Sequence, residues 1–182
     1  MHVMQYLLTE VERMDEQTVE DIEQEAIGHV NAWLDMQADG NGFVGGWSDG
    51  CSVGGRWKDV PILIYSDENA CEFLEALDMI DLKQLSQFNE YFGEFDFPTI
   101  NSLMVKFGNG EEIEYPEMHQ ANLYSLTSAI KIMQGYWNWD SAYYDTVDWS
   151  PKTKHLRARI KQAIDKNDNA MLYCLVPVDF HF

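Results

Sequence analysis

Both ends of the chain have the pattern of β-strands, and most of the sequence between them has the pattern of helices. The two strand-like runs are His2–Thr9 and Met171–Val178, each rich in apolar residues and followed or preceded by polar stretches. Strands at both termini with helices mostly between them favour an α+β fold. We therefore expect a sandwich in which a mixed or antiparallel sheet pairs the first strand with the last and carries the helices on its surface.

The chain is long enough for one sizeable core. It has 182 residues, of which 46% are hydrophobic and 13% aromatic, and no linker-like tract divides it. We expect a single α+β domain over residues 1–182. The start of the sequence does not resemble a signal peptide, and no apolar run approaches the roughly 20 residues that span a bilayer. A soluble, intracellular protein without membrane contact is the expectation.

Cysteine usage excludes two further classes of protein. Cys51, Cys71 and Cys174 are scattered and form no C-x-x-C pair. This spacing is typical neither of a disulfide framework nor of a zinc site. We interpret the three residues as reduced thiols, with Cys71 and Cys174 in apolar surroundings.

Five helices are predicted, four of them from apolar residues that recur every three or four positions. A capping box at Thr18–Asp21 begins the first, and Ser150-Pro151 precedes the last, which is basic. Asp81 is expected to cap a helix of its own, and Pro116 and Gly135 bracket a long one. The inward residues are expected to be Val19, Ile22, Ala26, Val30 and Trp33, then Ala70, Phe73, Leu74 and Leu77, then Leu82, Leu85, Phe88 and Phe92, and finally Leu156, Ile160 and Ile164.

Glycine-rich segments predict two hairpins and flank a short strand. The first hairpin spans Val44–Trp57, in which VGGW is echoed by VGGRW. The second is expected where Leu103–Phe107 and Glu112–Tyr115 flank Gly108-Asn109-Gly110. Between them, Val60–Tyr65 has the pattern of a buried strand.

Charge is the strongest indication of function. The chain has 31 acidic residues against 12 Lys and Arg, a formal net charge of −19. The first 100 residues hold 21 acidic and 4 basic residues, whereas residues 151–182 hold 3 and 6. Such a chain repels nucleic-acid backbones and acidic lipids and attracts basic surfaces, and it exceeds the net charge of about 2 to 8 that solubility needs.

Three groups of residues are candidates for contact with a basic partner. One is an acidic ridge on a helix, one lies at the second predicted hairpin, and one mixes aromatic and acidic side chains, as protein-binding hot spots do. These candidates are Glu68, Glu72, Glu75 and Asp78, then Glu111, Glu112 and Glu114, and then Trp139, Asp140, Asp145 and Asp148. Solvated faces are the competing interpretation of the acidic residues. Trp137 and Trp149 are expected to fill a core edge.

Two other features could carry chemistry. The first glycine-rich hairpin lacks the Lys-Ser/Thr of a phosphate loop. A structural role is therefore favoured, in which the glycines allow positive φ and close backbone approach. A binding tip of Trp47, Asp49 and Arg56 is the alternative. Asp179 and His181, two apart on a strand, could hold a metal with a third ligand. A solvated or hydrogen-bonded terminal pair is the commoner situation.

The sequence also resembles known proteins in short motifs. VGGRW at 53–57 and LVPVDFHF at 175–182, together with the opening strand, resemble uncharacterised phage-associated α+β proteins. In size and acidity the chain resembles anti-CRISPR proteins that inhibit the RNA-guided nuclease of type II systems. The resemblance implies a non-enzymatic, phage-derived inhibitor in the cytoplasm of the infected bacterial host.

Two functional hypotheses follow, and an interaction subunit of a phage particle or complex is a third possibility. In the first, a protein without cofactors binds a type II RNA-guided nuclease with its guide RNA through acidic surfaces and blocks DNA binding or cleavage, while Lys152–Lys161 allows a weak contact with nucleic acid. In the second, a small-ligand or metal-dependent phage enzyme uses the glycine-rich hairpin and Asp179/His181.

Overall fold

The computed structural model describes residues 2–39, 50–66, 69–93, 97–114, 130 and 142–181. Two compact units are formed, one by Met1–Lys83 with Trp137–Phe182 and the other by Gln84–Tyr136. The single domain expected over residues 1–182 stays a prediction. Among the described residues, no helix combines the length and the apolar character needed to cross a membrane.

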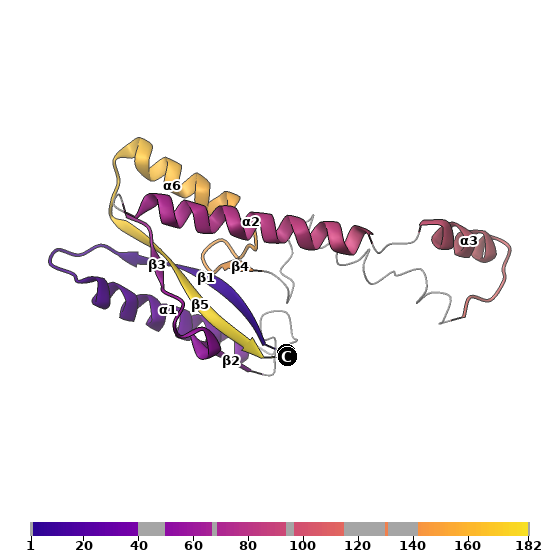
Figure 1. Ribbon diagram of the computed structural model, residues 1–182, viewed down its shortest axis with the longest axis horizontal. Helices are drawn as coiled ribbons and strands as arrows, with labels where there is room; N and C mark the ends of the chain where they lie inside the picture. The colour runs from indigo at the N-terminus through magenta and orange to yellow at the C-terminus, as the bar shows by residue number, and fades with distance from the viewer. Residues whose placement is uncertain are drawn as a thin grey trace. The chain divides into compact units, whose positions relative to one another are not determined.

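The first unit is built on a mixed five-stranded sheet whose two central strands are the ends of the chain (Figure 1). β1 (His2–Glu12) and β5 (Met171–His181) are antiparallel from the pair His2 and His181 to the pair Glu12 and Met171. β4 (Tyr143–Asp145) lies parallel to β1. β2 (Gly50–Val53) and β3 (Leu63–Ile64) are both antiparallel to β5. The predicted α+β class and the pairing of the terminal strands are confirmed.

Helices cover both faces of this sheet (Figure 1). α1 (Val19–Asp39) packs on one face, and the first part of α2 (Ala70–Gly93) packs with α6 (Lys154–Lys166) on the other. Side chains of β5 alternate between the faces, as a strand requires. The α1 core contains Ala26, Val30, Trp33, Leu172, Cys174, Val176, Val178 and Phe180, and the α2/α6 core contains Leu8, Phe73, Leu77, Tyr143, Leu156, Ile160, Tyr173 and Leu175.

The predicted start of α1 is confirmed at atomic detail. The backbone N–H and the hydroxyl of Thr18 donate to Asp21 Oδ2 at 2.9 and 2.6 Å, and the Asp21 N–H donates to Thr18 Oγ1 at 3.2 Å. This is the reciprocal arrangement of a capping box, with Asp in place of Glu. The hydroxyl and amide bonds lower the pKa of Asp21.

Three predictions about helices were wrong. Val19, expected to face inward, is 65% exposed, because it is the first residue of α1 and precedes the buried positions Ala26 and Val30. α2 runs through Asp81 without a break, because no Gly or Pro interrupts it and the Asp81 carboxylate binds Thr153 and Arg157 instead of capping a new helix. Leu82 and Leu85 are therefore exposed. Ile164 is 62% exposed although Leu156 and Ile160 are buried, since the last turn of α6 extends past the core.

The second predicted hairpin is a helix. α3 (Phe97–Gly108) ends where Gly110, at φ 72°, adopts the left-handed conformation. The Gly110 N–H donates to Phe107 O and the Glu111 N–H to Lys106 O, both at 3.0 Å, which is the Schellman pattern of a helix end. The Gly-Asn-Gly sequence thus stops a helix, and Glu111, Glu112 and Glu114 follow it as an exposed segment.

The first glycine-rich segment also differs from the prediction where it is described. β2 pairs with β5, and VGGRW leads into a 3₁₀ turn, η1 (Gly55–Trp57), instead of a second hairpin arm. Residues 40–49, including Trp47 and Asp49, and the helix predicted over Pro116–Gly135, apart from residue 130, lie outside the described residues. The strand predicted over Val60–Tyr65 is shorter, at Leu63–Ile64.

The three cysteines are free thiols. Cys174 is buried as predicted, and burial raises its pKa to about 12. Cys71 is exposed, so the prediction of apolar surroundings was wrong for this residue. The exposure of Cys71 follows from its position in the first turn of α2, because it lies two residues before the inward-facing Phe73 and so on a different side of the helix.

Candidate functional site

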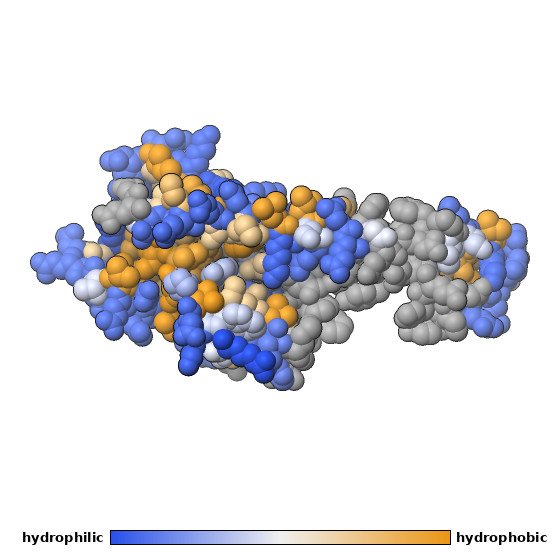
Figure 2. Space-filling view, in the orientation of Figure 1, coloured by the Kyte–Doolittle hydropathy of each residue, from blue (hydrophilic) through white to orange (hydrophobic). Residues whose placement is uncertain are grey.

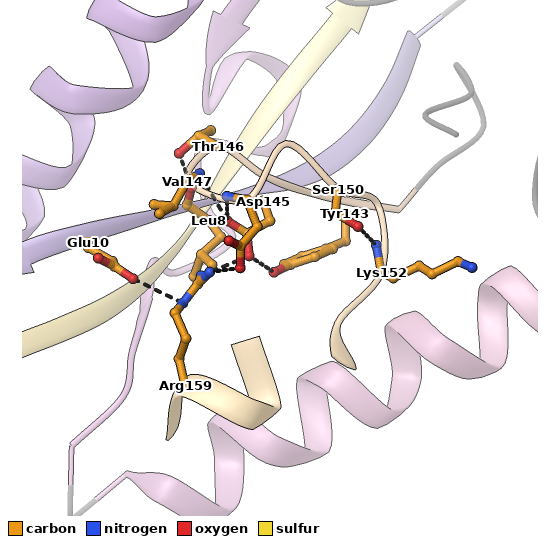
Figure 3. Close-up of polar contacts among 10 residues, drawn as sticks. Leu8, Glu10, Tyr143, Asp145, Thr146, Val147, Ser150, Lys152 and Arg159 are labelled. Atoms are coloured by element: carbon orange, nitrogen blue, oxygen red, sulfur yellow. Dashed lines mark hydrogen bonds and ion pairs between the residues drawn. The ribbon is translucent and has the colours of Figure 1, made fainter. Parts of the chain in front are cut away.

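Asp145 organises the turn that follows β4. Its side chain is fully buried, and its Oδ1 accepts hydrogen bonds from the backbone N–H groups of Val147 and Asp148, both at 2.9 Å. Its Oδ2 accepts from Arg159 Nη2 at 2.8 Å and more weakly from the Tyr143 hydroxyl at 3.4 Å. The carboxylate thus ties α6 to a turn that leaves the edge of the sheet (Figure 3).

Arg159 lies at the centre of three carboxylates. Besides Asp145, its guanidinium binds Asp148 through Nη1, and its Nε lies 3.1 Å from Glu10 Oε1 in an ion pair that lacks hydrogen-bond geometry. The guanidinium carbon also lies 5.9 Å from the ring centroid of Tyr173. We call Glu10, Asp145, Asp148 and Arg159 the Arg159 cluster. One positive charge faces three negative ones, so the cluster is acidic on balance.

Burial and like charges shift the pKa values of this cluster. Burial raises the pKa of Glu10, and Asp145 and Asp148 add to this while Arg159 opposes it. Burial also raises the pKa of the Tyr143 phenol far above its ordinary value, with Asp145 contributing. The tyrosine therefore stays a neutral hydrogen-bond donor to Asp145.

A second arginine neutralises part of the predicted acidic ridge. Arg157 Nη2 lies 2.8 Å from Asp78 Oδ1 and 2.9 Å from Asp81 Oδ2, and the Thr153 hydroxyl donates to Asp81 Oδ1 at 2.7 Å. These contacts join α2 to α6. Three of the predicted contact residues, Asp78, Asp145 and Asp148, thus hold arginines of the same chain, which reduces the charge that they offer to a partner.

The other predicted contact residues fall into two groups. Glu72 and Glu75 are exposed on α2, as are Glu111, Glu112 and Glu114 after α3. Glu68, Trp139 and Asp140 lie outside the described residues. Within the basic segment Lys152–Lys161, Arg157 and Arg159 are occupied by carboxylates, while Lys154 and Lys161 are exposed.

Asp179 has structural partners at the other end of the sheet. Its Oδ1 lies 2.9 Å from His2 Nδ1, and its Oδ2 accepts the Arg56 backbone N–H at 3.0 Å. The His2 and His181 rings have centroids 4.5 Å apart. Within the described ranges, no group of three or more His, Cys, Asp or Glu side chains could hold a metal ion. The positive φ expected for glycines of this segment is confirmed for Gly54 and Gly55, at φ 72° and 50°.

The structure also shows an acidic surface that the sequence analysis did not single out as a site. Glu12, Asp15, Glu16 and Glu20 are all exposed where β1 turns into α1, and Figure 2 shows this end of the first unit, at the left of the view, as hydrophilic. α1 itself holds six acidic residues and no Lys or Arg. The density of acidic residues between positions 10 and 25 was the signal that could have found this surface. We call Glu12, Asp15, Glu16 and Glu20 the α1 acidic surface.

Trp149 is the other residue that the sequence interpretation missed. The prediction that it fills a core edge was wrong, because it is 55% exposed. One side of the ring packs on Trp33, at a centroid distance of 5.9 Å, while the turn holds the residue at the surface. No family model, curated protein or solved structure matches this chain.

Proposed function

We propose that this protein is a non-enzymatic binding protein that presents carboxylates to a basic protein surface. The proposed partner is a type II RNA-guided nuclease with its guide RNA, met in the cytoplasm of an infected bacterium, as the resemblance to anti-CRISPR proteins implies. Carboxylates would occupy part of the basic channel that holds nucleic acid, or impede the rearrangement that precedes cleavage.

The observation that carries the proposal is the α1 acidic surface. Glu12, Asp15, Glu16 and Glu20 are exposed within nine residues, and the nearest basic side chain in sequence, Arg13, supplies one positive charge among them. Five other acidic residues of the first unit, Glu10, Asp78, Asp81, Asp145 and Asp148, contact the arginines of α6. Unbalanced surface charge of this kind steers association with a cationic groove and fixes its orientation.

The proposal is tested by removing charge from one surface at a time. A first variant carries Glu12→Gln, Asp15→Asn, Glu16→Gln and Glu20→Gln. A second removes four charges from other predicted contacts, with Glu72→Gln, Glu75→Gln, Glu111→Gln and Glu112→Gln. Each is measured for binding to purified type II nucleases, with and without guide RNA, and for inhibition of DNA cleavage.

The expected result is that the first variant weakens binding about tenfold or more and flattens its dependence on salt, since each exposed charge pair contributes roughly 0.2–1 kcal/mol. A loss confined to the second variant would still support binding through carboxylates and would move the contact to α2 and the segment after α3. Unchanged binding by both variants, or no binding by the natural sequence, would overturn the proposal.

A further inference from the structure

The turn that carries Trp149 is rigid. Asp145 and Ser150 exchange backbone hydrogen bonds, the Asp145 N–H donating to Ser150 O at 2.8 Å and the Ser150 N–H to Asp145 O at 3.3 Å. Inside this closed turn, Asp145 Oδ1 accepts two backbone N–H groups, and the Thr146 hydroxyl donates to Leu8 O. The position of the residues at its tip is therefore fixed before any partner arrives.

Two local features of this turn are unfavourable for folding. Trp149 has φ 52°, a conformation that costs a bulky residue roughly 1–2 kcal/mol relative to glycine. Trp33, whose ring contacts that of Trp149 at a tilt of 59°, is 8% exposed, and its Nε1 is buried without a hydrogen-bond partner among the described residues. Departures of this kind from good packing concentrate at functional sites.

The turn with these unfavourable features places an aromatic ring at the surface. Trp149 is 55% exposed and its neighbour Val147 is 46% exposed. The Trp33 ring contacts the Trp149 ring and also lies 5.5 Å, centroid to centroid, from the Tyr144 ring. A tryptophan that is fixed on a rigid support and open on one side can bind a partner with little loss of side-chain entropy.

The charge beside the ring selects the partner. Asp148, which precedes Trp149, belongs to the Arg159 cluster, where three carboxylates share one guanidinium. The balance is two negative charges, and burial together with these like charges opposes ionisation of Glu10. Of the three carboxylates, Asp148 is exposed and directly precedes Trp149, whereas Asp145 is fully buried, so a cation at this turn would meet the Asp148 carboxylate and an aromatic face. A guanidinium suits this pair best, because it stacks on indole rings and binds carboxylates at the same time.

We propose that Trp149 is the anchor of the partner-binding surface and that it receives an arginine side chain from a basic segment of the partner protein. The proposal rests on the function proposed above and adds that recognition depends on arginine, and on this turn, as well as on total charge. The arginine lies over the open face of the Trp149 ring, and its segment extends along neighbouring carboxylates.

The test uses two labelled peptides, hexa-arginine and hexa-lysine, which have equal charge. The natural protein is expected to bind the arginine peptide several-fold more tightly, because lysine stacks less well on indole. Trp149→Gly removes the ring and relieves the positive φ, so it tests the ring without adding backbone strain. It should weaken arginine-peptide binding about fivefold and abolish the preference, and Trp149→Phe should retain part of it.

Two controls make the outcome decisive. Met36→Ala truncates another exposed apolar side chain, of 53% exposure, and should leave the preference intact, while circular dichroism checks that each variant is folded. If Trp149→Gly binds both peptides as the natural protein does, this inference is overturned. The four-charge α1 variant should weaken the binding of both peptides equally. If it does so while Trp149→Gly changes neither, this inference fails and the proposed function stands.

Discussion

Gly55 lies where the side chain of Asp179 leaves no room for a Cβ. A Cβ built at this position would lie 2.4 Å from Asp179 Cβ and 2.6 Å from its Oδ2, and the residue has φ 50°. The close approach is what allows the neighbouring Arg56 N–H to reach the Asp179 carboxylate. The glycine therefore positions η1 over the end of β5 through steric necessity.

We expect Gly55→Ala to lower the free energy of unfolding by about 2–4 kcal/mol, because it adds both a clash and a strained φ. Gly28→Ala is the matched control, since its Cβ would meet nothing within 4 Å in α1. It should raise stability by about 0.5–1 kcal/mol. Urea denaturation measures both, and a Gly55→Ala variant as stable as the natural protein would contradict the described contact with Asp179.

Two carboxylates of the Arg159 cluster should respond oppositely to neutralisation. Asp145→Asn keeps an oxygen for the Val147 and Asp148 N–H groups but removes the charge and places an NH2 donor against the Arg159 guanidinium at a fully buried position, and we expect a loss of about 2–4 kcal/mol. Glu10→Gln should be neutral or stabilising at pH 7.5, because the raised pKa of Glu10 means that folding opposes its ionisation.

The pH dependence follows from the sign of that shift. A carboxyl whose pKa is higher in the folded state contributes nothing below its unfolded pKa, disfavours folding increasingly as the pH rises above that value, and has its full effect once the pH exceeds the folded pKa. The stability of Glu10→Gln minus that of the natural protein should therefore increase between pH 5 and pH 7.5 in urea titrations. A difference that decreases over this range would show that the ion pair with Arg159 outweighs burial.

At the scale of elements, the third apolar position of α6 shows what apolar spacing can and cannot predict about burial. Leu156, Ile160 and Ile164 have identical spacing in sequence, yet exposure is 0%, 4% and 62%. The pattern identifies the face of a helix, but where the helix passes the edge of the sheet depends on β5 and α2. Alanine substitutions of Ile160 and Ile164 should therefore differ in their effect on stability.

Ile160→Ala should destabilise the protein by about 2–5 kcal/mol, since it leaves a cavity beneath α6, whereas Ile164→Ala should cost less than about 1 kcal/mol. Thermal unfolding of the two variants, followed by circular dichroism at 222 nm, makes the comparison. Equal losses would mean that the last turn of α6 is buried against the protein after all.

The ends of elements were harder to predict than the elements themselves. Gly108-Asn109-Gly110 is compatible with both a hairpin and a Schellman end, and the structure uses the second. Asp81 has the character of a helix cap, but its carboxylate binds Arg157 and Thr153 from α6. In both cases the choice depends on residues distant in sequence or on the preceding element, which local pattern does not contain.

For the molecule as a whole, the sequence predicted the α+β class and the pairing of the terminal strands, because apolar runs at both ends can be buried by pairing with each other. It did not predict which carboxylates would be neutralised, since Arg157 and Arg159 reach residues as distant as Asp78 and Glu10 only through the fold. Trp149 was misplaced for a similar reason. Its exposure comes from the turn closed between Asp145 and Ser150, and composition alone indicates only that large rings are usually buried.

The net charge of −19 should make the stability of the protein rise with salt. Arg157 and Arg159 together contact five of the 31 acidic residues, so most of the remaining acidic residues repel one another, and this repulsion is screened beyond about 10 Å at 0.1 M ionic strength. We expect Tm to increase as sodium chloride is raised from 20 to 500 mM. The four-charge α1 variant should have a higher Tm at 20 mM and a smaller increase with salt, because part of the repulsion is already removed. A Tm that falls with salt in the natural protein would instead show that the arginine contacts dominate, and would remove the reason to regard its surface charge as a cost that binding to a cationic partner offsets.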